Sequence, residues 1–229
     1  SITDARYVDS AKIVYDLGLM ENIYENPNAT ITKGEFCEIA VKMLGAEDVA
    51  KGMKDSSSIF SDVTTGTDLN GYVRYLCNKG VINGDGAGAF GVATEMTYAQ
   101  ILKVLVSITG YEVYAQSSGG YPTGYLVAAS SVGIMSGVSL GVDSTVTREQ
   151  MGRLAANTIE TKLMEVESFT VQGPIYKKTD KTLLFDYMGY VRILGTGYAT
   201  GNEISIEKNI LFSKDYPKGI ASADVEIEN

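Results

Sequence analysis

The sequence predicts a mainly helical fold of three tandem helix–loop–helix repeats, followed by a small α+β segment. The repeats are indicated by a helix-starting pattern, Thr-x-x-Glu/Gln, which occurs at Thr32, Thr97 and Thr147. They are also indicated by a glycine and an apolar pair that precede each of these threonines at a similar distance. After about residue 164 the helical periodicity gives way to short strand-like runs, which predict the final segment.

The first helix of each repeat is predicted to end at a glycine, namely Gly18, Gly80 or Gly133. Apolar residues stand four and seven positions before each of these glycines, as on one face of a helix. A glycine just after such a run is typical of a left-handed helix stop. A glycine-rich loop then leads to the second helix, and residues 46–60 form a polar insertion between the first two repeats.

The second helix of each repeat is predicted to begin at its threonine. The threonine hydroxyl caps the backbone N–H three residues on, and the Glu or Gln found there reaches back to the threonine N–H. Gly45 and Gly110 are expected to end the first two of these helices, whereas Glu160 takes that position in the third, which can run longer. The apolar faces of the three helices are expected to share one core, composed of Phe36, Ile39, Met43, Ile101, Val104, Ile108, Met151 and Leu154.

The repeats are assigned to residues 1–163, at about 1–46, 58–112 and 119–163, and the α+β segment to residues 164–229. Strands are predicted near 166–171, 204–206 and 223–228, with a short helix over 180–187. A segment of this size buries little core alone. It is therefore expected to dock on the helices or to begin a further domain.

The composition argues against several classes of function. A net charge of −9 disfavours broad nucleic-acid binding, and no apolar run is long enough for membrane insertion. The chain has no histidine, so the commonest general base and the Ser-His and Cys-His nucleophiles are missing. The two cysteines, Cys37 and Cys77, are expected to be buried free thiols rather than zinc ligands. We expect no metal, no cofactor and no enzyme, because no carboxylate pair stands in a context typical of a glycosidase.

One glycine-rich stretch is a weak motif. Residues 86–91 fit G-x-G-x-x-G, but a helix rather than a strand is predicted before them and the next helix begins only at Thr97. Residues 83–94 resemble a calcium loop faintly, with Thr94 where a bidentate Glu is needed. We interpret this stretch as a turn.

Several motifs together resemble the S-layer homology (SLH) domain of clostridial-type surface proteins. Residues 60–63 (Phe-Ser-Asp-Val) match the usual opening of its repeat, and residues 79–86 match the Gly-Ile and glycine-rich middle. Residues 32–35 and 147–150 match its Thr-Arg-Ala-Glu helix start, and residues 120–125 resemble third-repeat sequences. The resemblance covers about residues 3–163.

The resemblance implies a pseudo-threefold helical unit that is secreted and holds a protein non-covalently on a Gram-positive cell wall. The implied partner is an anionic secondary cell-wall polysaccharide, often pyruvylated, which is bound in grooves between repeats. An alternative is that the module has lost glycan binding and serves protein–protein contacts with other surface-layer proteins.

An acidic sugar needs a cation, backbone donors at helix starts, and glycines that allow close approach. The three motif-arginine positions hold Lys33, Tyr98 and Arg148, so the second groove lacks a charged anchor and Arg148 is expected to be the principal ligand residue. The alternative for Arg148 is a surface arginine paired with Glu149 or another acid. The candidate glycan-binding residues are Arg148, Lys33, Thr147, Asp62, Gly84, Asp85 and Tyr121.

Overall fold

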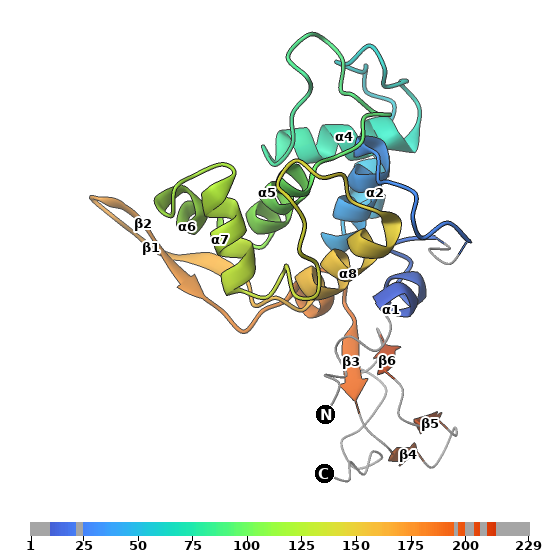
Figure 1. Ribbon diagram of the computed structural model, residues 1–229, viewed down its shortest axis with the longest axis vertical. Helices are drawn as coiled ribbons and strands as arrows, with labels where there is room; N and C mark the ends of the chain where they lie inside the picture. The colour runs from blue at the N-terminus through green and yellow to red at the C-terminus, as the bar shows by residue number, and fades with distance from the viewer. Residues whose placement is uncertain (1–9, 22–24, 195–196, 200–203, 207–209, 214–229) are drawn as a thin grey trace.

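The computed structural model describes residues 10–21, 25–194, 197–199, 204–206 and 210–213. This part of the chain is mainly helical, with three separate two-stranded antiparallel sheets. Figure 1 shows the helices gathered into one body, with the β1–β2 hairpin projecting from one side of it.

The helices are α1 (Ser10–Asp16), α2 (Lys33–Met43), α3 (Glu47–Lys51), α4 (Asp68–Asn78), α5 (Tyr98–Ile108), α6 (Glu112–Ser117), α7 (Thr123–Ser131), α8 (Arg148–Ile159) and the π-helical turn η3 (Leu183–Tyr187). The strands are β1 (Met164–Thr170), β2 (Gly173–Lys178), β3 (Val191–Leu194), β4 (Gly197–Ala199), β5 (Ile204–Ile206) and β6 (Ile210–Ser213). The antiparallel pairs are β1–β2, β3–β6 and β4–β5.

All three predicted capping boxes are present, at the starts of α2, α5 and α8. The hydroxyls of Thr32, Thr97 and Thr147 accept the backbone N–H three residues on at 3.3, 3.3 and 3.2 Å. The side chain of that third residue accepts the threonine N–H at 3.0, 3.0 and 2.9 Å. Each box satisfies two N–H groups that have no partner within the helix.

The predicted helix stops are also confirmed. Gly18, Gly80 and Gly133 follow α1, α4 and α7 with φ of 67°, 73° and 83°, a region that strains residues with a side chain. Gly45 and Gly110 end α2 and α5 in the same conformation. The last of the three capped helices, α8, has 12 residues, whereas α2 and α5 have 11 each. This difference agrees with the absence of a glycine at the end of α8.

Each of the three capped helices packs on a helix from another part of the chain. α2 lies on α4, α5 on α7, and α8 on α1 (Figure 1). Three backbone hydrogen bonds, each of 2.8 Å, join the starts of the capped helices to distant loops. The donors and acceptors are Lys33 N–H to Thr94 O, Tyr98 N–H to Ser144 O, and Arg148 N–H to Ala29 O. The first N–H of each capped helix is therefore satisfied by the segment that leads into another unit's helix.

The predicted core forms one cluster. Every predicted core residue is buried except Ile108, which is partly buried against the same cluster. Cys37 is a buried free thiol as predicted, whereas Cys77 is free but only partly buried. The helices thus share their apolar faces, as the sequence periodicity indicates.

Two short helices were not predicted. The polar insertion at 46–60 contains α3, and α6 follows Gly110. The buried side chain of Asn70 on α4 donates to the carbonyls of Lys54 and Ser56, both at 2.7 Å, and so holds the insertion in place. Such short helices lack the length over which sequence periodicity is detectable.

The chain after α8 docks on the helical body. Leu183, Leu184 and Met188 are buried in the common core. A Cβ added to Gly45 would lie 2.0 Å from the carbonyl oxygen of Tyr187, so only glycine permits this approach. The strands predicted near 166–171 and 204–206 are found as β1 and β5. The helix predicted over 180–187 is shorter and consists of the single turn η3. The strand predicted over 223–228 lies outside the described residues.

Candidate functional site

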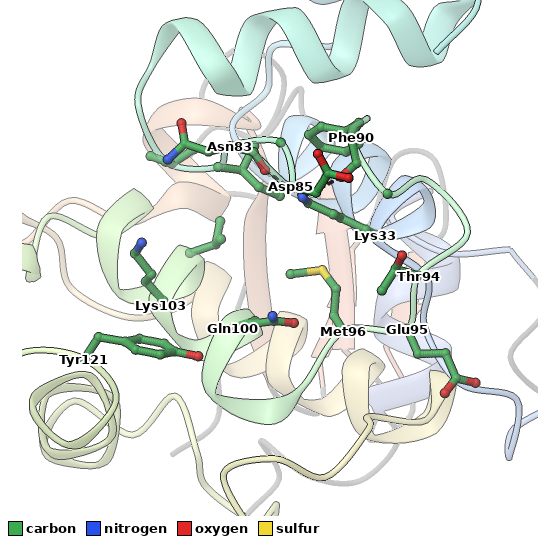
Figure 2. Close-up of a pocket in the computed structure, with 15 residues that line it drawn as sticks. Lys33, Asn83, Asp85, Phe90, Thr94, Glu95, Met96, Gln100, Lys103 and Tyr121 are labelled. Carbon is green, nitrogen blue, oxygen red and sulfur yellow. Dashed lines mark hydrogen bonds between the residues drawn. The ribbon is translucent and has the colours of Figure 1, made fainter. Parts of the chain in front are cut away.

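A groove of about 440 Å³ lies between the start of α2, the loop after α4, and α5. Figure 2 shows Lys33 and Asp85 on one side of the groove, Gln100 and Met96 along its floor, and Lys103 with Tyr121 toward one end. The structure thus brings together four of the predicted residues from distant parts of the chain: Lys33, Gly84, Asp85 and Tyr121.

Lys33, in the first turn of α2, supplies the cation of this groove. Its Nζ donates to the carbonyls of Asn83 at 2.6 Å and Phe90 at 2.7 Å, and lies 4.2 Å from the centroid of the Phe90 ring. Among the described residues, no carboxylate oxygen lies within 4.0 Å of Nζ of Lys33, so it forms no salt bridge with them. Burial lowers the pKa of Lys33, and electrostatic interactions with Cys37, Cys77, Asp85 and Asp62, in decreasing order, offset only part of this effect. A partly desolvated cation without a carboxylate partner favours an anionic ligand.

Asp62, a predicted ligand, instead braces the loop that faces Lys33. Its carboxylate accepts three successive backbone N–H groups, from Phe90 at 2.6 Å, Gly91 at 2.8 Å and Val92 at 2.9 Å. These hydrogen bonds, with that from Phe90 the largest cause, lower the pKa of Asp62. Asp62 therefore fixes the Phe90 carbonyl to which Lys33 donates.

Gly84 and Asp85 shape the same loop. A Cβ on Gly84 would lie 2.3 Å from Cε1 of Phe60, whose ring centroid is 5.3 Å from that of Phe90. The Asp85 carboxylate accepts the N–H groups of Ala87 at 2.7 Å and Ala89 at 3.1 Å, which closes the predicted turn. The contacts of Gly84 and Asp85 with their own loop thus fix its shape.

Tyr121 and Lys103 form the other end of the groove. The Tyr121 side chain is 52% exposed, and Nζ of Lys103 lies 5.9 Å from its ring centroid. An exposed tyrosine offers a sugar a flat apolar face with a polar edge. Lys103 was not predicted as a site residue; the available signal was that it is the only charged residue of α5.

Arg148 lies in a separate groove of about 270 Å³, beside α2. Its Nη1 is 3.0 Å from a carboxylate oxygen of Glu35, and its Nη2 donates to the carbonyl of Glu21 at 3.0 Å. The other cation of this groove, Lys42, is paired with Glu38 at 2.7 Å. Both positive charges are therefore neutralised by the protein itself. Thr147 is at the same helix start, where its side chain is used as the cap.

Tyr98 occupies the second motif position and is fully buried. Its hydroxyl donates to the carbonyl of Val138 at 2.7 Å, so the side chain packs against the loop of the third repeat. Lys33, Tyr98 and Arg148 thus each reach a loop that is distant in the chain. Of these three, only Lys33 carries a charge without a carboxylate partner among the described residues.

In the part of the chain that the structure describes, no group of three or more His, Cys, Asp or Glu residues could hold a metal ion. No helix among these residues is both long and apolar enough to cross a membrane.

Comparison with known proteins gives a consistent picture. Residues 59–102 match the family described as the S-layer homology domain. The chain is 24% identical over 165 residues to a "Cell surface protein" of Thermoanaerobacter kivui. The aligned region covers 71% of this chain and 21% of that protein. It is 26% identical over 175 residues to the "Middle cell wall protein" of Brevibacillus brevis, and this alignment covers 76% of this chain and 16% of that protein.

A third relative, the "Surface layer protein" of Brevibacillus choshinensis, is 25% identical over 204 residues, covering 87% of this chain and 18% of that protein. The chain thus spans about a fifth or less of the length of these curated relatives.

Proposed function

The chain carries an S-layer homology domain, and from that premise we propose that it is a non-catalytic module that anchors a longer protein to the cell surface. The ligand in this proposal is an anionic wall polysaccharide, such as the pyruvylated polymer that the family resemblance implies. The relatives described as cell surface, cell wall and surface layer proteins support a location at the wall outside the cell.

The observation that carries the proposal is the state of Lys33. Its ammonium faces a groove of about 440 Å³ and is partly desolvated, and among the described residues its partners are two carbonyl oxygens and an aromatic ring. Two acids, Asp85 and Glu95, line the same groove, but neither forms a salt bridge with Lys33, so the carboxylate of an acidic sugar can supply a direct counter-charge. Tyr121 offers the sugar ring a face to lie on, and Lys103 adds a second positive charge nearby.

We further propose that residues 1–163 are three repeats in a pseudo-threefold arrangement. The cyclic helix pairs and the three equivalent backbone hydrogen bonds at the helix starts support it. In such an arrangement each groove lies between two repeats. The Lys33 groove then becomes the principal site, because Tyr98 is buried and Arg148 is already paired.

The test is co-sedimentation of the protein with purified cell-wall sacculi, before and after chemical removal of the secondary polymer. Binding that is lost on stripping, and that is weakened by Lys33→Ala, supports the proposal. Tyr15→Ala, at an exposed residue outside the grooves described above, is the matched control.

The alternative is a structural protein–protein module within a surface layer. The observation that favours it is that two of the three motif positions are satisfied internally, Tyr98 by Val138 and Arg148 by Glu35. If the parent protein does not co-sediment with intact sacculi, this alternative replaces the glycan proposal.

A further inference from the structure

Lys103 of α5 is the second cation that lines the Lys33 groove. Among the described residues, Nζ of Lys103 forms no hydrogen bond and has no carboxylate oxygen within 4.0 Å. It lies 5.9 Å from the centroid of the Tyr121 ring. Lys33 differs, because its Nζ already donates to the carbonyls of Asn83 and Phe90. Within the described structure, the three N–H donors of the Lys103 ammonium are therefore all available to a ligand.

The ring of Tyr121 packs against a well-held neighbour. It lies edge-on to Tyr125, with 6.3 Å between the ring centroids. Tyr125 is buried, and its hydroxyl donates to Glu112 at 3.0 Å and accepts from Gln116 at 3.1 Å. Tyr121 itself stays 52% exposed, so a flat apolar surface beside Lys103 is open to a sugar ring.

Two carboxylates also line this groove, and both already have partners in the protein. Asp85 accepts two backbone N–H groups of its own loop. Glu95 accepts the hydroxyl hydrogen of Thr30, and Figure 2 shows its carboxylate pointing away from Lys103. The two acids balance the charge of the two lysines at long range. A ligand anion can nevertheless contact Lys103 directly, because it has no described carboxylate partner to displace.

The two lysines lie at different ends of the groove. Figure 2 shows Lys33 beside the loop after α4 and Lys103 with Tyr121 toward the other end, with Gln100 and Met96 between them. The volume of about 440 Å³ is within the range of about 300–1,000 Å³ that holds drug-sized ligands, which are larger than one sugar ring. An acidic sugar at Lys33 therefore leaves the other end of the groove to the next sugar.

The Arg148 groove lacks this second contact point. Equivalent residues, three, six and seven positions after the capping threonine, line both grooves: Glu35, Glu38 and Ile39 in one, and Gln100, Lys103 and Val104 in the other. The sixth position is thus an acid where the Lys33 groove has Lys103. Glu38 is paired with Lys42 at 2.7 Å, and none of the described residues that line the Arg148 groove is aromatic.

We propose that Lys103 and Tyr121 form a second subsite, which binds the sugar next to the one at Lys33 and selects for an acidic group on that sugar as well. Lys103 contacts the second anionic group, and Tyr121 lies against the ring that carries it. The ligand class is then an acidic oligosaccharide with anionic groups on two neighbouring sugars, rather than a chain with one acidic end. That this ligand belongs to the cell wall rests on the proposed function.

The test compares two fragments of the secondary polymer, released from sacculi by mild acid and separated by charge. One fragment carries a single acidic group, and the other carries acidic groups on two neighbouring sugars. Isothermal titration calorimetry of each fragment with the protein gives two dissociation constants. The parent should bind the two-acid fragment about tenfold or more tighter than the one-acid fragment, as one additional charge-assisted contact allows.

Lys103→Ala should reduce this preference to less than about threefold, because the second anionic group then has no cation to contact. Tyr121→Ala should also reduce the preference, whereas Lys33→Ala should weaken the binding of both fragments. Lys103→Arg keeps the charge and should keep the preference. Lys177→Ala is the matched control, since it removes an exposed lysine of β2 that does not line the groove, and it should leave the preference unchanged.

The inference is overturned if Lys103→Ala or Tyr121→Ala, shown by circular dichroism to be folded, keeps the preference of the parent. It is equally overturned if Lys177→Ala loses the preference as Lys103→Ala does, or if the polymer yields no fragment with acidic groups on two neighbouring sugars. A parent that binds both fragments equally well refutes the second subsite and leaves the proposed function in place. A parent that binds neither fragment refutes both proposals.

Discussion

The guanidinium of Arg148 lies 3.0 Å from the carboxylate of Glu35, a residue 113 positions earlier in the chain. The same carboxylate caps α2 through the N–H of Thr32, so one side chain both starts a helix and neutralises the only arginine at the motif positions. The pair joins the third repeat to the first. Since both side chains are partly exposed, it is expected to stabilise the fold by no more than about 1 kcal/mol.

Lys33→Ala should weaken binding to the wall polymer by about 1.5–3 kcal/mol, the range for a hydrogen bond to a charged group. Arg148→Ala should weaken it less, because its guanidinium is already satisfied by Glu35 and Glu21. Equilibrium co-sedimentation with sacculi measures both. A larger loss for Arg148→Ala would instead support Arg148 as the principal ligand residue, as expected from the sequence.

Loss of the Asp62 charge should loosen the loop over residues 90–92. The pKa of Asp62 is lowered in the fold, so its stabilising effect is present above the unfolded pKa of about 3.9 and is lost as the pH falls through the folded pKa. Asp62→Asn should therefore unfold at lower urea concentration than the parent at pH 6, and this difference should shrink at pH 3.

Amide hydrogen exchange of Gly91 and Val92 gives a local measure of the same effect. Their N–H groups donate to Asp62, so they should exchange faster in Asp62→Asn than in the parent at pH 6. Equal protection in both proteins would show that the loop is held by other contacts.

Tyr98→Phe should destabilise the fold without affecting wall binding. The substitution leaves the carbonyl of Val138 without its 2.7 Å hydrogen bond in a buried setting, at a cost of about 1–3 kcal/mol. Thermal or urea unfolding measures the loss, and co-sedimentation should remain at the parent level. Weaker binding by a folded Tyr98→Phe protein would mean that the second motif position also contributes to the ligand site.

Thr97→Ala should lower the free energy of unfolding by about 1 kcal/mol, because the side-chain half of the capping box of α5 is removed. Thr145→Ala, an exposed threonine in the segment before α8, is the control and should change stability by less than about 0.5 kcal/mol. Equal effects of the two substitutions would show that the cap contributes little.

The two thiols should react at different rates with a disulfide reagent under native conditions. Burial raises the pKa of both Cys37 and Cys77, but Cys37 is fully buried and Cys77 only partly so. Cys77 should therefore be modified slowly and Cys37 only on unfolding. The intact mass of the protein, measured after reaction without urea and after reaction in urea, gives the number of modified thiols in the folded and unfolded states. Two fast-reacting thiols, or a mass that corresponds to a disulfide, would contradict this assignment.

Local signals in the sequence were sufficient for the helical repeats. A threonine followed by Glu or Gln satisfies the helix start within four residues, and a glycine relieves strain at the helix end within one. These effects depend on neighbours in the chain, so Thr32, Thr97, Thr147, Gly18 and Gly80 could be assigned correctly. The docking of η3 on Gly45 and the short helices α3 and α6 depend on distant partners, and were missed or only partly expected.

The candidate site divides in the same way. The sequence alone singled out the three motif positions and Asp62, Gly84 and Asp85 as candidate ligand residues, because each belongs to a short motif. The structure places Gly84 and Asp85 in the Lys33 groove and Asp62 against the loop over residues 90–92, and their role in binding stays a prediction. Only the tertiary structure decided which motif cation is unpaired: Lys33 meets carbonyl groups 50 and 57 residues away, whereas Arg148 meets Glu35 across 113 residues. The physical reason is that the charge available to a ligand is what remains after all neighbours in space have been counted, and spacing along the chain does not determine those neighbours.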